Sequence, residues 1–409
     1  MFNRGFSHYL TYGATDQHTI IELSSLIDGV VVPATVAAFQ RDGTGGFVLT
    51  LSARETGPDY VIDPRFPLFQ QGLKNSGRKP KKSHTMLSKL LGDEALVRSS
   101  DPSPEDFDDE RIVRIADQWV KFNLGYTEVD SKFAKYAKRL KEEILPENAK
   151  TPKYIIAPYF MSSGIRDPWW ERSTRFFQAT QAAVADRAEC IRVLALKSAN
   201  VLAEAVESVG DSRVALWVNN LHELNSDSGE LAYYLNGVQV ARRLSVSTFA
   251  LYGGFFSVIA ANVGLGGSCH GIGFGEHRKW VELPSSGPAP ARFYSPALHR
   301  YISQEDAYEL WRIDKTAFGC KCDECKGQNP LRLEYHELMK HSVRCRADEI
   351  NKWTSLPLEE VSIRLKDEYS RYIDLVESAV IAERIRERLL RLPEHLPRWF
   401  RAVDSVVVG

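Results

Sequence analysis

Three cysteines near residue 320 have the spacing of metal ligands. Cys320, Cys322 and Cys325 form a C-x-C-x-x-C cluster, and four of the six cysteines in the chain lie between residues 320 and 345. Three thiolates and one imidazole complete a tetrahedral zinc site with no open position for chemistry, so the pattern predicts a structural zinc ion. The candidate fourth ligands are His341, which we favour, His336 and Cys345.

A second group of candidates consists of polar, aromatic and small residues that follow strand-like hydrophobic runs. A single residue of this kind often only caps a turn. Their recurrence after consecutive runs predicts an active site. If the runs are neighbouring strands, their carboxylates, amides and imidazoles would meet where those strands end. The members of this group with carboxylate or imidazole side chains suited to catalysis include Asp63, Glu276 and His277. The others are candidate substrate contacts, namely Tyr159, Asn219, Asn220, Tyr252, Gly253, Gly254, Arg278 and His299.

The elements that must position these residues alternate between strands and helices. The predicted strands are residues 29–36, 47–51, 60–63, 154–160, 191–196, 214–219, 248–252, 269–274 and 292–294. The predicted helices between the later strands are residues 169–188, 199–208, 231–244 and 258–263. This alternation indicates parallel βαβ units and favours an α/β fold, a (β/α)8 TIM-like barrel. A doubly wound open sheet is the alternative, but no G-x-G-x-x-G motif follows an early strand.

Two segments depart from this alternation. Residues 74–150 are charged and mostly helical in pattern, and we interpret them as an insertion in the barrel. The insertion begins with a basic run that could follow a nucleic-acid backbone, although such runs are more often solvated loops. The run consists of Lys74, Arg78, Lys79, Lys81 and Lys82. The predicted organisation is a barrel at residues 1–315, followed by a zinc-binding helical subdomain at residues 316–409.

The composition is that of a globular protein, with 44% hydrophobic and 26% charged residues. The chain has no apolar run of about 18 residues and no signal-peptide-like start, so we expect no membrane contact. Cysteines grouped as metal ligands suit a reducing compartment, which predicts a cytoplasmic location. A net charge of -1 argues against wholesale coating of nucleic acid but leaves room for a local basic groove.

The barrel pattern, the C-x-C-x-x-C cluster and the downstream histidine together resemble the tRNA-guanine transglycosylase superfamily, over about residues 59–341. In that family, a barrel with a C-terminal zinc subdomain breaks an N-glycosidic bond in a polynucleotide. Two segments look more like the DNA-acting branch, which inserts 7-deazaguanine bases into DNA or excises modified phage bases in bacterial defence. These segments are Ile62-Asp63-Pro64 and Tyr294-Ser295-Pro296-Ala297-Leu298-His299.

The resemblance implies chemistry on a modified base that has been flipped out of DNA. Breaking a base–sugar bond passes through an oxocarbenium-like state, which a carboxylate such as Asp63 would stabilise. Glu276 or His277 would protonate the departing base, and Arg278 would hold the flanking phosphate. Stacking and amide side chains for the flipped base are also available. They are Tyr159, Tyr252, Asn219 and Asn220.

Hydrolysis and base exchange make different demands on the site. Exchange needs a dedicated nucleophile and a covalent intermediate. The tRNA enzymes carry a nucleophilic Asp before a Pro-Thr-Arg run, whereas the comparable window here, residues 269–278, contains no Asp. We therefore predict a DNA glycosylase that hydrolytically excises a modified base, in defence against phage. The alternatives are a transglycosylase that inserts a 7-deazaguanine into DNA or tRNA, and a catalytically inactive, zinc-stabilised nucleic-acid-binding barrel.

Overall fold

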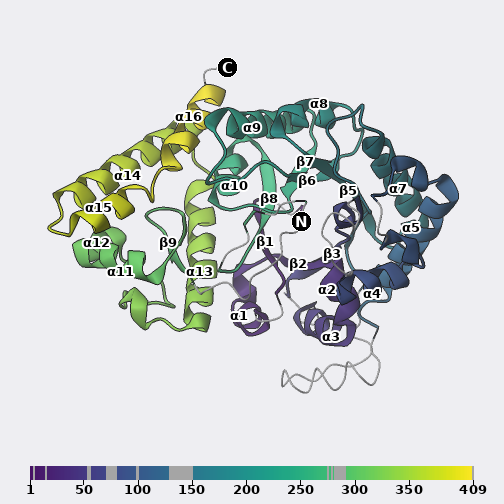
Figure 1. Ribbon diagram of the computed structural model, residues 1–409, viewed down its shortest axis with the longest axis horizontal. Coiled ribbons are helices and arrows are strands. Elements are labelled where there is room, and N and C mark those ends of the chain that lie inside the picture. Colours follow the sequence, from purple (N-terminus) through teal and green to yellow (C-terminus); the bar gives the residue numbers. More distant parts are fainter. Residues whose placement is uncertain are drawn as a thin grey trace.

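The centre of the molecule is a sheet of eight parallel strands, in the order β3-β2-β1-β8-β7-β6-β5-β4, with helices around its outside (Figure 1). This computed structural model describes residues 1–2, 5–13, 16–52, 57–70, 81–97, 101–128, 151–273, 276–277, 280 and 292–407. The strands are β1 (Ser7–Thr11), β2 (Gly29–Pro33), β3 (Asp59–Asp63), β4 (Tyr154–Ile156), β5 (Glu189–Leu196), β6 (Arg213–Val218), β7 (Ser247–Ala250) and β8 (Leu265–His270). This order is that of a (β/α)8 barrel, and the predicted fold class is confirmed.

The barrel is nearly closed, and side chains bridge the seam between β3 and β4. Just after β3, the Gln70 amide donates to the Met161 carbonyl at 2.9 Å and accepts from the Met161 backbone N–H at 2.6 Å. This pair of bonds resembles the pair of backbone hydrogen bonds that one residue makes with a neighbouring strand. Gln70 and Met161 both follow the C-terminal ends of these strands, so the bridge lies at the rim that carries the candidate site.

The barrel interior is filled by alternate side chains from the strands. Tyr9, Val61 and Phe249 belong to one buried interior cluster, whereas Leu10, the neighbour of Tyr9, packs outward against the surrounding helices. This in-and-out alternation follows from the two-residue period of a strand. Because the interior is packed, a ligand can approach only at the rims.

Some of the helices that surround the barrel begin at a short polar side chain that caps them. Asp167 accepts from the Trp169 N–H, and Asp227 accepts from the Glu230 N–H, each at the start of a helix. The surrounding helices are α1 (Gln17–Glu22), α2 (Ala34–Phe39), α3 (Arg41–Ser52), α4 (Lys82–Leu90), α5 (Asp109–Leu124), α7 (Pro168–Val184), α8 (Leu202–Glu207), α9 (Ser228–Arg243) and α10 (Phe255–Ala260).

The structure corrects several predicted elements. Residues 47–51 lie in helix α3 and not in a strand, because their apolar run is buried on every side and shows neither period clearly. β1 was not predicted, since a histidine and a serine interrupt its short apolar pattern. Residues 292–294 lie in a separate antiparallel hairpin, β9 (Phe293–Ser295) and β10 (Arg300–Ile302), outside the barrel. β8 begins four residues earlier than predicted.

The chain after the hairpin is helical, as predicted, and packs on one side of the barrel (Figure 1). Within it, α13 contacts α10 and β9, and α16 contacts α9. Its helices are α11 (Gln304–Ile313), α12 (Lys315–Phe318), α13 (Tyr335–Trp353), α14 (Leu358–Ser378), α15 (Glu383–Leu390) and α16 (Leu396–Val407). The predicted boundary at residue 315 falls at the start of α12.

The predicted insertion is described only in part. Its described residues include α4 and α5, and α5 packs against α7 on the outside of the barrel. Residues 71–80 and 129–150 lie outside the described ranges. Within those ranges, no helix is both long and apolar enough to cross a membrane.

Candidate active site and metal centre

Asp63 lies at the C-terminal end of β3 and has no exposed surface. Its Oδ1 accepts hydrogen bonds from the Tyr159 hydroxyl at 2.7 Å and from the Arg65 backbone N–H at 3.1 Å. Its Oδ2 accepts a hydrogen bond from the Tyr252 hydroxyl. Burial, followed by the charge of Asp63, raises the pKa of Tyr159, so this hydroxyl keeps its proton and stays a donor. The structure thus brings together three residues that the sequence had placed at separate strand ends.

An aromatic wall stands beside Asp63. The Trp217 ring, from the end of β6, meets the Tyr159 ring edge-on at 6.0 Å between centroids and the Tyr252 ring at 5.3 Å. Tyr159 is fully buried, whereas Tyr252 is half-buried. Tyr252 is therefore the member of the wall that a ligand at the rim would meet first.

A second tryptophan extends this wall over the ends of β5 and β6. The Trp280 backbone N–H donates to Asn219 Oδ1 at 2.7 Å, and the Lys197 ammonium lies 5.2 Å from the Trp280 ring centroid. Asn219 also donates from Nδ2 to Asn220 Oδ1 at 3.0 Å. The predicted amide residues therefore lie at the rim, and Asn219 holds the backbone of an aromatic residue there.

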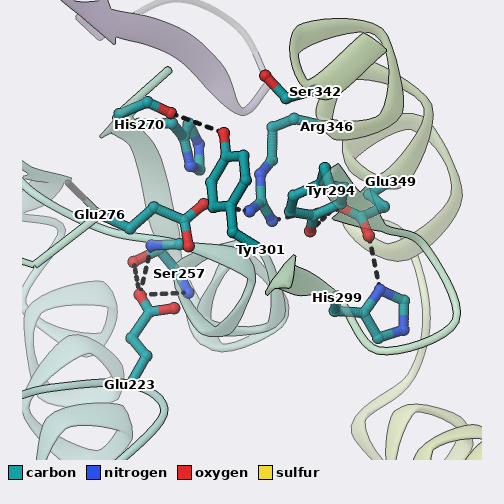
Figure 2. Close-up of polar contacts among 12 residues, drawn as sticks. Glu223, Ser257, His270, Glu276, Tyr294, His299, Tyr301, Ser342, Arg346 and Glu349 are labelled. Atoms are coloured by element: carbon teal, nitrogen blue, oxygen red, sulfur yellow. Dashed lines mark hydrogen bonds and ion pairs between the residues drawn. The ribbon is translucent and has the colours of Figure 1, made fainter. Parts of the chain in front are cut away.

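Glu276 follows β8 and is largely buried, with 16% of its side chain exposed. Its Oε1 accepts a hydrogen bond at 2.6 Å from the guanidinium of Arg346, a residue of α13 (Figure 2). Burial raises the pKa of Glu276 to about 7, although the charge of Arg346 opposes that shift. The carboxyl lines a cavity of about 270 Å³. A carboxyl with this pKa can exchange a proton with a ligand near neutral pH.

Glu223 lies close to Glu276 but has a different environment. It accepts hydrogen bonds from the Gly254 N–H at 2.7 Å and the Phe256 N–H at 2.8 Å. It also accepts one from the Ser257 hydroxyl at 2.7 Å (Figure 2). These groups belong to the first turn of α10, where backbone N–H groups have no partner within the helix. Burial raises the pKa of Glu223, and these hydrogen bonds oppose that shift. Its carboxyl is thus committed to holding the loop after β7.

Gly254 leaves the space in which both carboxyl groups fit. A Cβ at this position would lie 2.7 Å from Oε2 of Glu223 and 2.7 Å from Oε2 of Glu276. We expect Gly254→Ala to displace Glu276 and not Glu223, because the Glu223 carboxyl is held by three donors from the loop. Activity should fall far more than thermal stability, as measured by kcat/KM and by the melting temperature. Gly210→Ala is a matched control, because a Cβ there meets no atom within 4 Å. Equal activity in the two variants would show that the position of Glu276 is unimportant.

A buried ion-pair network runs from Glu276 through α13 to α14. Arg346 also pairs with Glu349 at 3.1 Å, and Glu349 accepts from the His299 ring at 2.6 Å. The other His299 ring nitrogen lies 2.9 Å from Glu368. Burial lowers the pKa of His299, but the two carboxylates outweigh it and raise the pKa to about 9. Both ring nitrogens of His299 are hydrogen-bonded and the residue is buried. His299 therefore has a structural role, and it is not placed as the substrate contact that the sequence predicted.

The remaining predicted residues fall into four groups. His277 borders the same cavity as Glu276, and its Nδ1 donates to the Leu221 carbonyl at 2.8 Å. Gly253 packs so tightly against Ser257 that a Cβ would lie 2.1 Å from Oγ. Lys81 and Lys82 are exposed at the start of α4, a helix that packs on α2. The predicted residues outside the described ranges are Lys74, Arg78, Lys79 and Arg278.

The cysteine cluster and α13 form a group that could hold a metal ion. The ligand atoms of Cys320, Cys322, His341 and Cys345 all lie within 4.8 Å of one another. Cys320 and Cys345 are 3.6 Å apart at Sγ, and His341 Nδ1 lies 3.3 Å from Cys322 Sγ and 3.5 Å from Cys345 Sγ. Metal–ligand bonds of about 2.0–2.3 Å give tetrahedral edges of roughly 3.5–3.8 Å, so these spacings fit such an ion.

The neighbours of the cluster also favour metal binding. His341 Nε2 donates to the Tyr294 carbonyl at 2.7 Å, which leaves Nδ1 directed at the thiols. The group of four contains Cys345 and not Cys325, and His341 and Cys345 lie four residues apart on one face of α13. The Cys325 Sγ lies 3.4 Å from that of Cys322 but donates to the Cys320 carbonyl at 3.2 Å. His336 is exposed on another face of the helix.

Several residues of the site were missed by the sequence analysis. Glu223 lies in an irregular loop after β6, where no periodic pattern singles out a residue. Arg346 and Glu349 could have been found from the sequence, because they are charged residues at positions on the apolar, buried face of α13. A buried charge needs a partner of opposite sign, so this pattern could have predicted an ion-pair network.

Comparisons with known proteins complete the description. No family model and no curated protein matches the sequence. Among solved structures, a putative fructose-1,6-biphosphate aldolase from Coccidioides immitis is similar with a TM-score of 0.36 and 8% identity, covering 86% of this chain and 93% of that one. TsXylA, an intracellular xylanase from Thermoanaerobacterium saccharolyticum, has a TM-score of 0.35 and 8% identity, covering 71% of this chain and 92% of that one. Likenesses this distant say nothing about what the chain binds, and the barrel is established by its own strand order.

Proposed function

We propose that the chain is an N-glycosidic-bond hydrolase, a DNA glycosylase that excises a modified base. The main support is the presence of two carboxyl groups with different environments at one rim of the barrel. Asp63 is held as a hydrogen-bond acceptor, and Glu276 has a pKa near neutrality. The loop after β7 joins them, because Tyr252 bonds to Asp63 and Gly254 lies against Glu276. Pairs of carboxyls in unlike environments are typical of acid and charge-stabilising roles in glycosidic cleavage.

Each group has a distinct part in this proposal. Glu276 donates its proton to the departing base as the bond from the base to C1′ breaks. The negative charge of Asp63 stabilises the oxocarbenium-like sugar. A water molecule then forms a bond from its oxygen to C1′ and releases its proton to the solvent. Asp63 has no exposed surface, so Tyr252 must move aside when the sugar approaches. The half-buried Trp280 and Tyr252 offer faces on which a flipped base can stack.

Hydrolysis, and not exchange, is the form of the reaction that we propose. Exchange needs a second nucleophile that holds the sugar until a new base arrives. Asp63 and Glu276 already have parts in this proposal, and Glu223 is bonded to the first turn of α10. Water is therefore the acceptor that the site accommodates best.

We also propose that the metal of the cysteine cluster is zinc. Three thiolates and an imidazole suit zinc and fill its tetrahedral coordination, so the ion would have a structural role. α13 carries His341 and Cys345, and Arg346, which follows Cys345 in the same helix, donates a hydrogen bond to Glu276. A metal that fixes α13 would thus help to fix the proton donor.

The pH dependence tests the role assigned to Glu276. A proton donor works in its protonated form, which predominates below its pKa of about 7. We therefore expect kcat/KM to fall as the pH rises through 7, by about tenfold per pH unit at higher pH. Glu276→Gln should have low activity without this alkaline limb. An alkaline limb that persists in Glu276→Gln would assign the proton donor to another group.

The reaction itself is tested with DNA that carries different modified bases. We expect an abasic site to form without any added free base, and alkali should then cut the strand at that site. Unmodified DNA should be nearly inert, because a pocket built for an extra substituent leaves polar groups unpaired, at a cost of roughly 1–3 kcal/mol each. Incorporation of a labelled free 7-deazaguanine into DNA, with no abasic product, would instead establish exchange.

A further inference from the structure

The cavity beside Glu276 has a cationic side that the chemistry proposed above does not use. Arg292, just before β9, and Arg300, in β10, line it together with residues of the loops that follow the barrel strands. His222 and His277 also line it, with ring centroids 4.7 Å apart. At about 270 Å³ the cavity is smaller than most sites for drug-sized ligands, which occupy roughly 300–1,000 Å³, and suits a small polar group.

The two arginines lack carboxylate partners among the described residues. Arg300 donates from one terminal nitrogen to the Leu392 carbonyl at 3.1 Å, while its Nε is buried with no hydrogen-bond partner in those residues. Both guanidinium groups line the same cavity, and burial, followed by the charge of Arg292, lowers the pKa of Arg300. A buried donor without a partner and two like charges are both relieved by an anion.

The carboxyl groups at the cavity do not supply this anion. Glu223 accepts from the backbone N–H groups at the start of α10, and Glu276 accepts from Arg346. The Tyr301 hydroxyl is also committed, since it donates to the Gly271 carbonyl at 3.0 Å. Arg292 and Arg300 thus line the cavity without an ion pair to any described carboxylate, and only the charge of the nearby Glu276 acts on Arg300.

We propose that this cavity binds a phosphate group of a nucleotide or polynucleotide through Arg292 and Arg300. The binding itself follows from the cavity, while the source of the phosphate rests on the proposed function, in which the substrate is a DNA strand. A guanidinium presents N–H groups in a planar fork that matches phosphate oxygens. A phosphate held here lies next to Glu276, so it would anchor the strand beside the proton donor and select nucleic acid over an uncharged glycoside.

Calorimetric titration of the full chain tests the site without any turnover. The probes are inorganic phosphate, a deoxynucleoside 5′-monophosphate and a short oligonucleotide without terminal phosphates. Arg292→Gln is the decisive variant, because Arg292 is exposed and its replacement should leave the fold intact. Arg300→Lys keeps the charge but loses the fork. Arg243→Gln is the matched control, because Arg243 lies with Arg401 in a different groove between α9 and α16.

We expect phosphate binding to weaken at least about tenfold in Arg292→Gln, the effect of losing one charge-assisted hydrogen bond, and to be unchanged in Arg243→Gln. Binding of the oligonucleotide would identify a phosphodiester of the strand, and binding of only the monophosphate would identify a terminal phosphate. No phosphate binding, or binding that survives in Arg292→Gln and Arg300→Lys, would overturn the proposal. Phosphate binding without base excision would leave this site established and would refute the proposed hydrolase.

Discussion

Replacing Asp63 by Asn should lower kcat/KM on a competent modified DNA by about a thousandfold while leaving the fold intact. The physical reason is that the carboxylate charge acts mainly on the oxocarbenium-like transition state, whereas Asn has the same shape. The side chain would keep its place, because an amide can still hydrogen-bond to the hydroxyls of Tyr159 and Tyr252. Single-turnover rates and the thermal midpoint, measured on the same preparation, separate the two effects.

Asp59→Asn is the control for this experiment. Asp59 lies at the opposite end of β3, at the N-terminal rim of the barrel, so the same change in charge should leave the rate near that of the unmodified chain. Tyr252→Phe should have an intermediate rate, because it removes one of the donors that hold Asp63. A rate for Asp63→Asn equal to that of Asp59→Asn would move the charge-stabilising role to another strand end.

Loss of a metal ligand should have the largest effect on stability. Cys345→Ser and Cys322→Ser are each expected to release the metal and to destabilise the helices after the hairpin. Closed sites of this kind contribute on the order of 10 kcal/mol to folding in small peptides. Metal content measured by mass spectrometry, together with the thermal midpoint, records both results.

Two further cysteine variants make this test specific. Cys325→Ser should retain more metal than Cys345→Ser, because Cys345 and not Cys325 belongs to the group of mutually close ligand atoms. Cys190→Ser is the control, since Cys190 lies on β5 in the barrel wall. A well-folded chain that contains no metal would refute the metal centre. Equal metal loss in Cys325→Ser and Cys345→Ser would indicate that both thiols coordinate the ion.

The rim of the site was partly readable from the sequence because a barrel imposes a strong geometric rule. Parallel strands bring their C-terminal ends to one rim, so residues that follow separate strands must converge. Asp63, Tyr159 and Tyr252 obeyed this rule, and they are joined by hydrogen bonds in the structure. The rule fails for His299, because the run before it belongs to a hairpin outside the barrel.

Pairing across distant segments could not be predicted in the same way. Glu276 and Arg346 are 70 residues apart, and nothing in the local pattern of either one identifies the other. The same holds for Glu223 and the first turn of α10, which meet only because the loops after β6 and β7 pack together. The pKa of Glu276 is a product of this packing, since burial is its largest cause.

The sequence by itself determined the alternation of strands and helices, the candidate ligands around residue 320 and the polar residues at the strand ends. These are local properties, set by hydrophobic period and by the spacing of a few side chains along the chain. Only the tertiary structure decided that Cys345 joins the metal group, that Arg346 holds Glu276 and that Arg292 and Arg300 share a cavity. The physical reason is that burial, charge pairing and ligand geometry depend on which elements pack together, and α13 and the hairpin reach the barrel rim only in the folded chain.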